Sequence, residues 1–130
     1  MLGSILRLAA LACGGAGLSH ALLGVSGDWI VGVQPASPVD PSLDSQNRFY
    51  GAAFLLYGLL LWIGARDVRR FAPILKAVFG IMFLAGCARG LAALAHGWPS
   101  TQILLLWASE LILPPMLWIW LNQNLKENAD

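Results

Sequence analysis

Two charged side chains lie deep inside apolar stretches of the sequence. Arg89 belongs to the stretch 72–96, and Glu110 lies near the middle of the stretch 101–121. An ionised side chain near the centre of a bilayer costs at least about 2.5 to 3.5 kcal/mol, so it normally faces protein, a partner or water. Counting at 1.5 Å per residue from the turn between the two stretches places Arg89 roughly 10 Å and Glu110 roughly 13 Å below one boundary. We therefore expect these two side chains to form an ion pair between neighbouring helices.

Further polar side chains fall at similar heights and could line one cavity with this pair. Helical rise puts Tyr57 at about the depth of Glu110 and His20 one turn from the end of the first apolar stretch. The candidate ligand-binding residues are Arg48, Arg89, Glu110, Tyr57, His20 and His96. Two arginines against one carboxylate would give the cavity a net positive charge, which favours an anionic or carbonyl-bearing head group.

Each of these residues also has a purely structural interpretation. Arg89 and Glu110 could serve only to hold helices together, and Arg48 could extend to the membrane interface. His20, His96 and Glu110 are residue types that bind metals, but they come from three different stretches without ligand spacing, so we expect no metal. The sequence contains no Walker, Rossmann or nucleophile-elbow motif, and we assign no catalytic residue and no cofactor.

The composition indicates the elements that position these residues. The chain has 130 residues, of which 58% are hydrophobic and 12% charged, against about 25% charged in soluble domains. Four stretches, at about residues 2–24, 47–65, 72–96 and 101–121, have the length of a membrane span. The first is longer than the core of a signal peptide, so we expect it to be retained. The sequence predicts one all-α domain, an integral membrane four-helix bundle over residues 1–130. A net charge of +1 without a basic stripe excludes nucleic-acid binding.

The positive residues indicate the orientation of the spans, because lysine and arginine resist translocation. If the chain crosses the membrane four times, six basic residues lie on the same side: Arg7, Arg66, Arg69, Arg70, Lys76 and Lys126. We expect both termini to be cytoplasmic and residues 25–46 to form a long first outer loop. Its prolines fit either a cap over the bundle or a mobile tether. Asp44 or Ser45 is expected to cap the helix that follows.

Small residues indicate where helices approach each other closely. Gly51, Gly58 and Ala65 recur every seven positions, and residues 86–90 form a small-xxx-small element around Arg89. We expect this pattern to serve packing within the chain rather than dimerisation. Cys13 and Cys87 both lie in apolar stretches and are expected to be small core residues.

Four short motifs resemble those of a known group of proteins. They are Asn47-Arg48-Phe49-Tyr50-Gly51, Gly86-x-x-Arg89, His96-Gly97-x-Pro99 and Glu110 followed by Pro114. Together they resemble an uncharacterised bacterial family of small four-helix membrane proteins, a domain of unknown function that is broadly DoxX-like. The similarity covers nearly the whole chain. It implies a bundle in the bacterial inner membrane and brings no established activity. The wider DoxX-like group includes components associated with quinone-linked sulfur oxidation, but this chain shows no redox cofactor ligands.

Three hypotheses of function follow. In the first, the outer-side Arg/Glu cavity of a non-enzymatic membrane protein binds a lipid-like or quinone-like head group, or receives the helix of a partner membrane protein. In the second, the chain is a structural accessory subunit of a larger membrane complex, and the pair of Arg89 and Glu110 only stabilises it. The third is an enzyme on a membrane-soluble substrate, with Glu110 as general base and Arg89 as electrostatic stabiliser. It is the least favoured, because pairing with arginine makes a carboxylate a weaker base.

Overall fold

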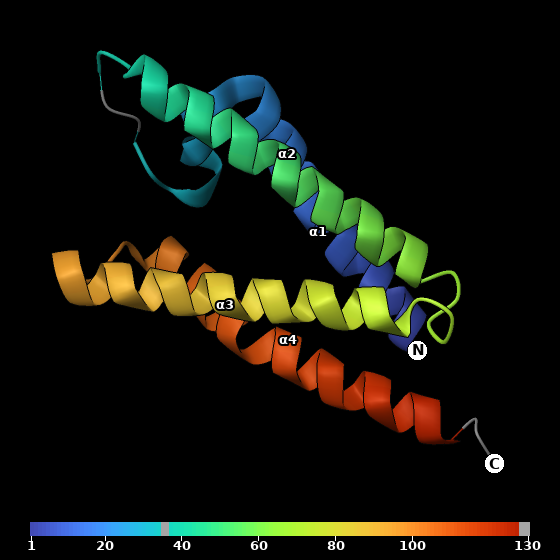
Figure 1. Cartoon of the computed structure of the whole chain (residues 1–130). Helices are drawn as coiled ribbons and strands as arrows, with labels where there is room; N and C mark the ends of the chain where they lie inside the picture. Colours follow the sequence, from blue (N-terminus) through green and yellow to red (C-terminus); the bar gives the residue numbers. More distant parts are fainter. Residues whose placement is uncertain (35–36, 128–130) are drawn as a thin grey trace.

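The computed structural model describes residues 1–34 and 37–127 of the chain. The described residues form four long helices and one short 3-10 helix, with no strand among them: α1 (Leu2–Leu23), η1 (Gly24–Val31), α2 (Pro41–Gly64), α3 (Ala72–His96) and α4 (Thr101–Glu127). Helices α1 and α2 pack against each other as one pair, and α3 and α4 form the second pair (Figure 1). This confirms the all-α four-helix bundle.

Helix α2 begins at Pro41, earlier than the start near residue 47 that the apolar pattern predicts. Asp40 is its N-cap, and the Asp40 carboxylate accepts hydrogen bonds from two backbone N–H groups of the first turn at 2.7 and 3.0 Å. Pro41 occupies the first helical position, where its missing N–H is not needed. The prediction that Asp44 or Ser45 caps this helix is therefore wrong. The reason is that the first two turns of α2 are polar, so apolar periodicity could not reveal them.

The first connection contains much less irregular chain than the 22-residue segment 25–46 suggests. Helix η1 continues directly from α1, and it packs against both α1 and α2. Residues 41–46 belong to α2. Between η1 and α2, the described residues outside helices are 32–34 and 37–40. Pro35, one of the prolines expected to shape this loop, lies outside the described residues.

Three of the described segments are long and apolar enough to cross a membrane: Leu2–Val31, Ala72–His96 and Thr101–Lys126. In the most apolar 18 residues of each segment, only 28%, 17% and 11% are buried inside the protein. Most of their apolar side chains are therefore left to contact lipid. The chain is a multi-pass membrane protein. Helix α2 has the necessary length, with 24 residues, but Asp44, Asn47 and Arg48 in its first two turns lower its mean hydropathy.

The buried core lies at one end of the bundle. It comprises Leu2, Leu6, Ala10, Cys13, Leu61, Ala65, Ala72, Leu75, Val78, Phe79 and Leu121. These residues come from the first halves of α1 and α3 and from the ends of α2 and α4. All four helices therefore meet near the N-terminus and the α2–α3 connection, and the two pairs diverge toward the other end (Figure 1). Cys13 is buried as expected, whereas Cys87 is exposed, so the core prediction is wrong for Cys87.

Glycines bring the backbones of α1 and α2 into direct contact. A Cβ added at Gly17 or Gly51 would overlap backbone atoms of the other helix, and one at Gly58 would lie 2.7 Å from the backbone nitrogen of Gly14. Ala65, the third member of the seven-residue series, is buried at the same side of α2 against the start of α1. The predicted use of these small residues in packing within the chain is confirmed.

Candidate functional site

Arg89 and Glu110 form the ion pair that their depths in the sequence predict. The Nε of Arg89 donates a hydrogen bond to Oε2 of Glu110 at 2.7 Å. The Glu110 side chain is only 5% exposed, whereas that of Arg89 is 35% exposed. Gly86 makes the close approach of α3 and α4 feasible, because a Cβ there would lie 3.1 Å from Cβ of Glu110. The pair thus joins two neighbouring helices, with the carboxylate on the buried side.

A cavity of about 370 Å³ lies beside the guanidinium of Arg89. It opens between the two helix pairs, and its lining residues come from α1, η1, α2, α3 and α4 and from the segment after η1: Ala16, His20, Asp28, Val31, Val33, Asn47, Tyr50, Gly51, Phe54, Arg89, Ile103 and Leu106. Most of these side chains are apolar. The volume and this composition are typical of a small-molecule site, which combines apolar walls with a few placed polar groups.

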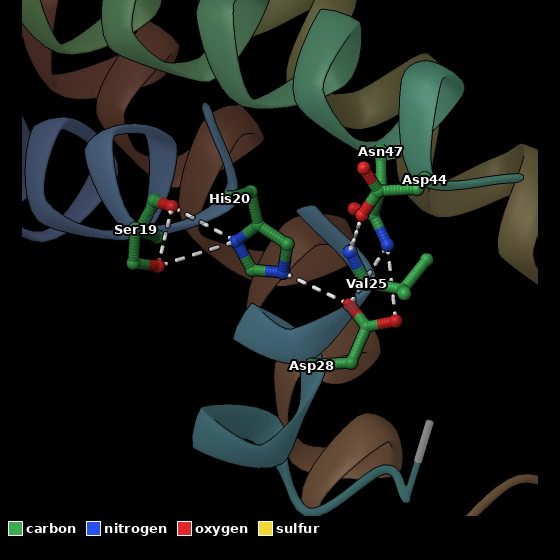
Figure 2. Close-up of polar contacts among 7 residues, drawn as sticks. Ser19, His20, Val25, Asp28, Asp44 and Asn47 are labelled. Carbon is green, nitrogen blue, oxygen red and sulfur yellow. Dashed lines mark hydrogen bonds and ion pairs between the residues drawn. The ribbon is translucent and has the colours of Figure 1, made fainter. Parts of the chain in front are cut away.

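A polar network among residues that line the cavity ties α1, η1 and α2 together (Figure 2). Nε2 of His20 on α1 lies 3.0 Å from Oδ1 of Asp28 on η1. The side-chain amide of Asn47 on α2 donates to both carboxylate oxygens of Asp28, at 3.1 and 3.0 Å. Asp28 is therefore held from two sides, and η1 is fastened over the ends of α1 and α2.

The contacts of His20 define where its protons lie. Its Nδ1 is 2.9 Å from the carbonyl oxygen of Ala16, which can only accept a hydrogen bond, so Nδ1 carries a proton. Its Nε2 faces the Asp28 carboxylate, another acceptor. Both ring nitrogens of His20 therefore face oxygen atoms, and the ring joins α1 to η1.

Ser19 stands next to this pair, and the three side chains have the composition of a hydrolytic triad. The Ser19 hydroxyl donates to the carbonyl of Ala16 at 2.9 Å and lies 3.4 Å from Nδ1 of His20. Because Nδ1 is itself a donor here, His20 cannot take the proton of Ser19. This arrangement is not that of an activated serine nucleophile.

The structure places Arg48 outside the cavity. Its Nε donates to Oδ2 of Asp44 at 2.7 Å, and its Nη1 donates to the carbonyls of Ala21 and Leu22 at 3.3 and 2.6 Å. Arg48 thus binds the last carbonyls of α1, a usual role for a cation at a helix C-terminus. Without Arg48 and with Asp28 in the wall, the net positive charge expected for the cavity is not found among its lining residues.

The remaining two predicted residues lie elsewhere. Tyr57 packs against the buried core and edge to face with Phe54, at 5.7 Å between ring centroids. His96 lines a second, smaller cavity of about 230 Å³ near the α3–α4 turn, which also borders Arg89 and Trp107. Of the six predicted ligand-binding residues, His20 and Arg89 line the cavity between the helix pairs, and Glu110 holds Arg89 in position.

Sequence reasoning missed Asp28, Asn47 and Tyr50, which all line the cavity. Asp28 was assigned to an outer loop, and only the folding of η1 onto α1 and α2 brings it to His20. Asn47 belongs to the motif Asn47-Arg48-Phe49-Tyr50-Gly51, so the sequence contained a signal for a role of Asn47. In the same motif Arg48 is the stronger candidate by sequence alone, because it is charged. Within residues 1–34 and 37–127, no group of three His, Cys, Asp or Glu side chains could hold a metal ion.

Fold and site together define a multi-pass four-helix membrane protein with a buried Arg–Glu pair beside a mainly apolar cavity. A family model described as a domain of unknown function, DUF4345, matches residues 1–121. The chain belongs to this family, which confirms the expectation of an uncharacterised family. No curated protein and no solved structure matches the chain.

Proposed function

We propose that this protein binds the head group of an amphipathic small molecule, lipid-like or quinone-like, in the cavity between its two helix pairs. The observation that carries the proposal is the position of Arg89. Its Nε is used by Glu110, while no described residue is hydrogen-bonded to its two Nη groups, and the side chain is 35% exposed at the cavity. Apolar walls beside an available guanidinium suit a molecule with an apolar body and a polar head. The same opening could receive the helix of a membrane partner.

We further propose that the protein lies in the bacterial inner membrane, that α2 is a fourth span, and that both termini are cytoplasmic. Helix α2 packs along α1 more extensively than any other described pair of elements does, which supports a shared depth. Arg66, Arg69 and Arg70 in the α2–α3 connection support a cytoplasmic position for that connection. The cavity then opens toward the outer leaflet. The likeness to DoxX-like proteins stays a prediction from sequence motifs.

A second candidate function is that of an accessory subunit in a larger membrane complex. It is supported by the small buried share of α3 and α4, whose most apolar windows are 17% and 11% buried. Partner helices could cover these faces as readily as lipid does, because packing in membranes does not depend on apolarity alone. In that case the ion pair between Arg89 and Glu110 would act only within the bundle.

Native mass spectrometry of protein extracted in a mild detergent tests the proposal. We expect a discrete small molecule to remain bound to the wild-type chain and to be lost from Arg89→Ala, because the guanidinium is its main donor. Arg66→Ala, which removes the same charge at the opposite end of the bundle, should retain it. A wild-type chain that carries only a stably associated protein would favour the accessory subunit, and equal retention by Arg89→Ala would contradict the role of the guanidinium.

A further inference from the structure

The charges that border the cavity are balanced in two separate pairs. Arg89 is neutralised by Glu110 at 2.7 Å, and Asp28 lies 3.0 Å from His20. Arg89, Asp28 and His20 line the cavity, and Glu110 lies behind Arg89. The other described lining residue with an ionisable side chain is Tyr50, whose hydroxyl is 3.1 Å from Oε1 of Gln46. The two pairs therefore bring no excess of positive charge to the cavity.

The hydrogen-bonding groups that remain available are unequal on the two walls. Both oxygens of Asp28 already accept hydrogen bonds, from His20 and Asn47. Arg89, by contrast, uses one of its five N–H donors on Glu110. The cavity thus offers mainly donors on the α3 side, next to apolar walls. An uncharged acceptor, such as a carbonyl or ester oxygen, satisfies such donors without adding charge.

A charged head group would meet a different situation. An anionic phosphate that approaches Arg89 also approaches the carboxylates of Glu110 and Asp28. Apart from Arg89, the described lining residues include no arginine or lysine, and His20 faces Asp28 through its Nε2. In a water-poor site such repulsion is screened weakly. Resting on the proposed function, we propose that the cavity selects net-neutral amphiphiles whose head group carries a carbonyl or ester oxygen for Arg89, and that it rejects anionic head groups.

A competition between two lipids with the same acyl chains tests this selectivity. Protein in mild detergent is incubated with equimolar dioleoylglycerol and dioleoylphosphatidylglycerol, and native mass spectrometry measures the ratio of the bound forms. We expect the neutral lipid to exceed the anionic one by at least about tenfold, which corresponds to about 1.4 kcal/mol. A parallel arm with decylubiquinone in place of dioleoylglycerol distinguishes a quinone from a lipid as the source of the carbonyl. Excess retention of either neutral compound over the anionic lipid supports the proposal.

Charge variants make the test specific to the cavity. Glu110→Gln keeps an oxygen for Arg89 but adds one net positive charge, so it should shift the bound ratio toward the anionic lipid by several-fold. Asp28→Asn makes the same change in the other pair and serves if Glu110→Gln fails to fold. Asp67→Asn, in the α2–α3 connection at the packed end of the bundle, is the matched control and should leave the ratio unchanged. Binding of the anionic lipid to wild type that equals or exceeds the binding of both neutral compounds, or a ratio that neither cavity variant alters, would overturn the proposal.

A blocked cavity separates this inference from the proposed function. Ala16→Trp places an indole in the cavity wall, whereas Ala12→Trp places it on an exposed position one turn earlier in α1. Bound neutral lipid should fall to background in Ala16→Trp and persist in Ala12→Trp. Equal binding of all compounds to Ala16→Trp and wild type would refute the binding cavity itself. Binding that Ala16→Trp abolishes but that favours the anionic lipid would refute only the selectivity.

Discussion

At the scale of single residues, the ion pair of Arg89 and Glu110 is asymmetric, because one partner is almost fully buried and the other is one-third exposed. Arg89→Leu should cost about 3 to 5 kcal/mol of unfolding free energy, since it leaves the Glu110 carboxylate buried without a partner. Glu110→Leu should cost less, because the guanidinium can turn to the cavity. The double variant Arg89→Leu with Glu110→Leu should recover most of the loss. Denaturation in mixed detergent micelles measures all three.

The double variant also distinguishes a structural role from a binding role. If it is folded yet retains no small molecule, the pair is needed for binding rather than for stability. Strictly additive losses in the two single variants would show that the two side chains do not interact, which contradicts the 2.7 Å contact.

Asp44 makes the stability of the contact between the start of α2 and η1 depend on pH. Its hydrogen bond from Arg48, together with one from the backbone N–H of Val25, lowers the pKa of the Asp44 carboxyl. Asp44 lies outside the apolar part of α2, which begins after Arg48. A carboxylate whose pKa is lower in the folded state stabilises the fold above its unfolded pKa, about 3.9, and this contribution is lost as the pH falls through the folded value.

We therefore expect acidification from pH 5 to pH 3 to lower the melting temperature of the wild type more than that of Asp44→Asn. Circular dichroism in detergent measures this difference. The Asp40 carboxyl also has a lowered pKa, because backbone N–H groups of the first turn of α2 bind it, so some pH dependence should remain in the variant. Identical acid profiles for both proteins would show that Asp44 and Arg48 do not interact in the membrane protein.

At the scale of elements, the contact of α1 with α2 depends on glycines that leave no room for a side chain. Gly17→Ala should destabilise the protein by about 1 to 3 kcal/mol, because the added Cβ would overlap the backbone of α2. Gly15→Ala is the matched control on the same helix, since nothing lies within 4 Å of a Cβ at that position. It should be neutral or mildly stabilising, because alanine favours the helix. Unfolding in detergent that affects both variants equally would argue against this helix contact.

At the scale of the whole molecule, the number of spans determines on which side each connection lies. The side of each connection can be measured with the single-cysteine variants Ser42→Cys, Asp67→Cys and Ser100→Cys, made in a chain without Cys13 and Cys87. Intact cells are treated with an impermeant maleimide, and labelling of each cysteine is measured. Four spans with cytoplasmic termini predict labelling at positions 42 and 100, and at 67 only after permeabilisation. If α2 does not span, positions 42 and 67 will show the same accessibility.

The buried core and the cavity lie at different ends of the bundle. All four helices meet in a buried apolar cluster near the N-terminus and the α2–α3 connection, while the cavity lies where the helix pairs diverge. The packed end holds the pairs in register, and the diverging end can admit a ligand without disturbing the core. Because the core and the cavity lie at different ends, we expect substitutions in the cavity to leave the protein folded.

The sequence by itself determined the quantities that run along the chain. A helical rise of 1.5 Å per residue sets the span lengths and the depths of Arg89 and Glu110. With 3.6 residues per turn, the seven-residue spacing of Gly51, Gly58 and Ala65 places these residues on one face of a helix. These properties belong to each helix separately. The ion pair could therefore be predicted before the structure was known, and so could a close helix contact at these small residues, although not that α1 is the partner.

Only the tertiary structure decided which side chains of equal depth face one another. Tyr57 packs against the core, and Arg48 turns to the end of α1 rather than into the cavity. Asp28 reaches His20 because η1 folds onto α1 and α2. Depth follows from the helix alone, but the rotation of each helix about its axis is set by packing against its neighbours, and no single stretch of sequence contains that information.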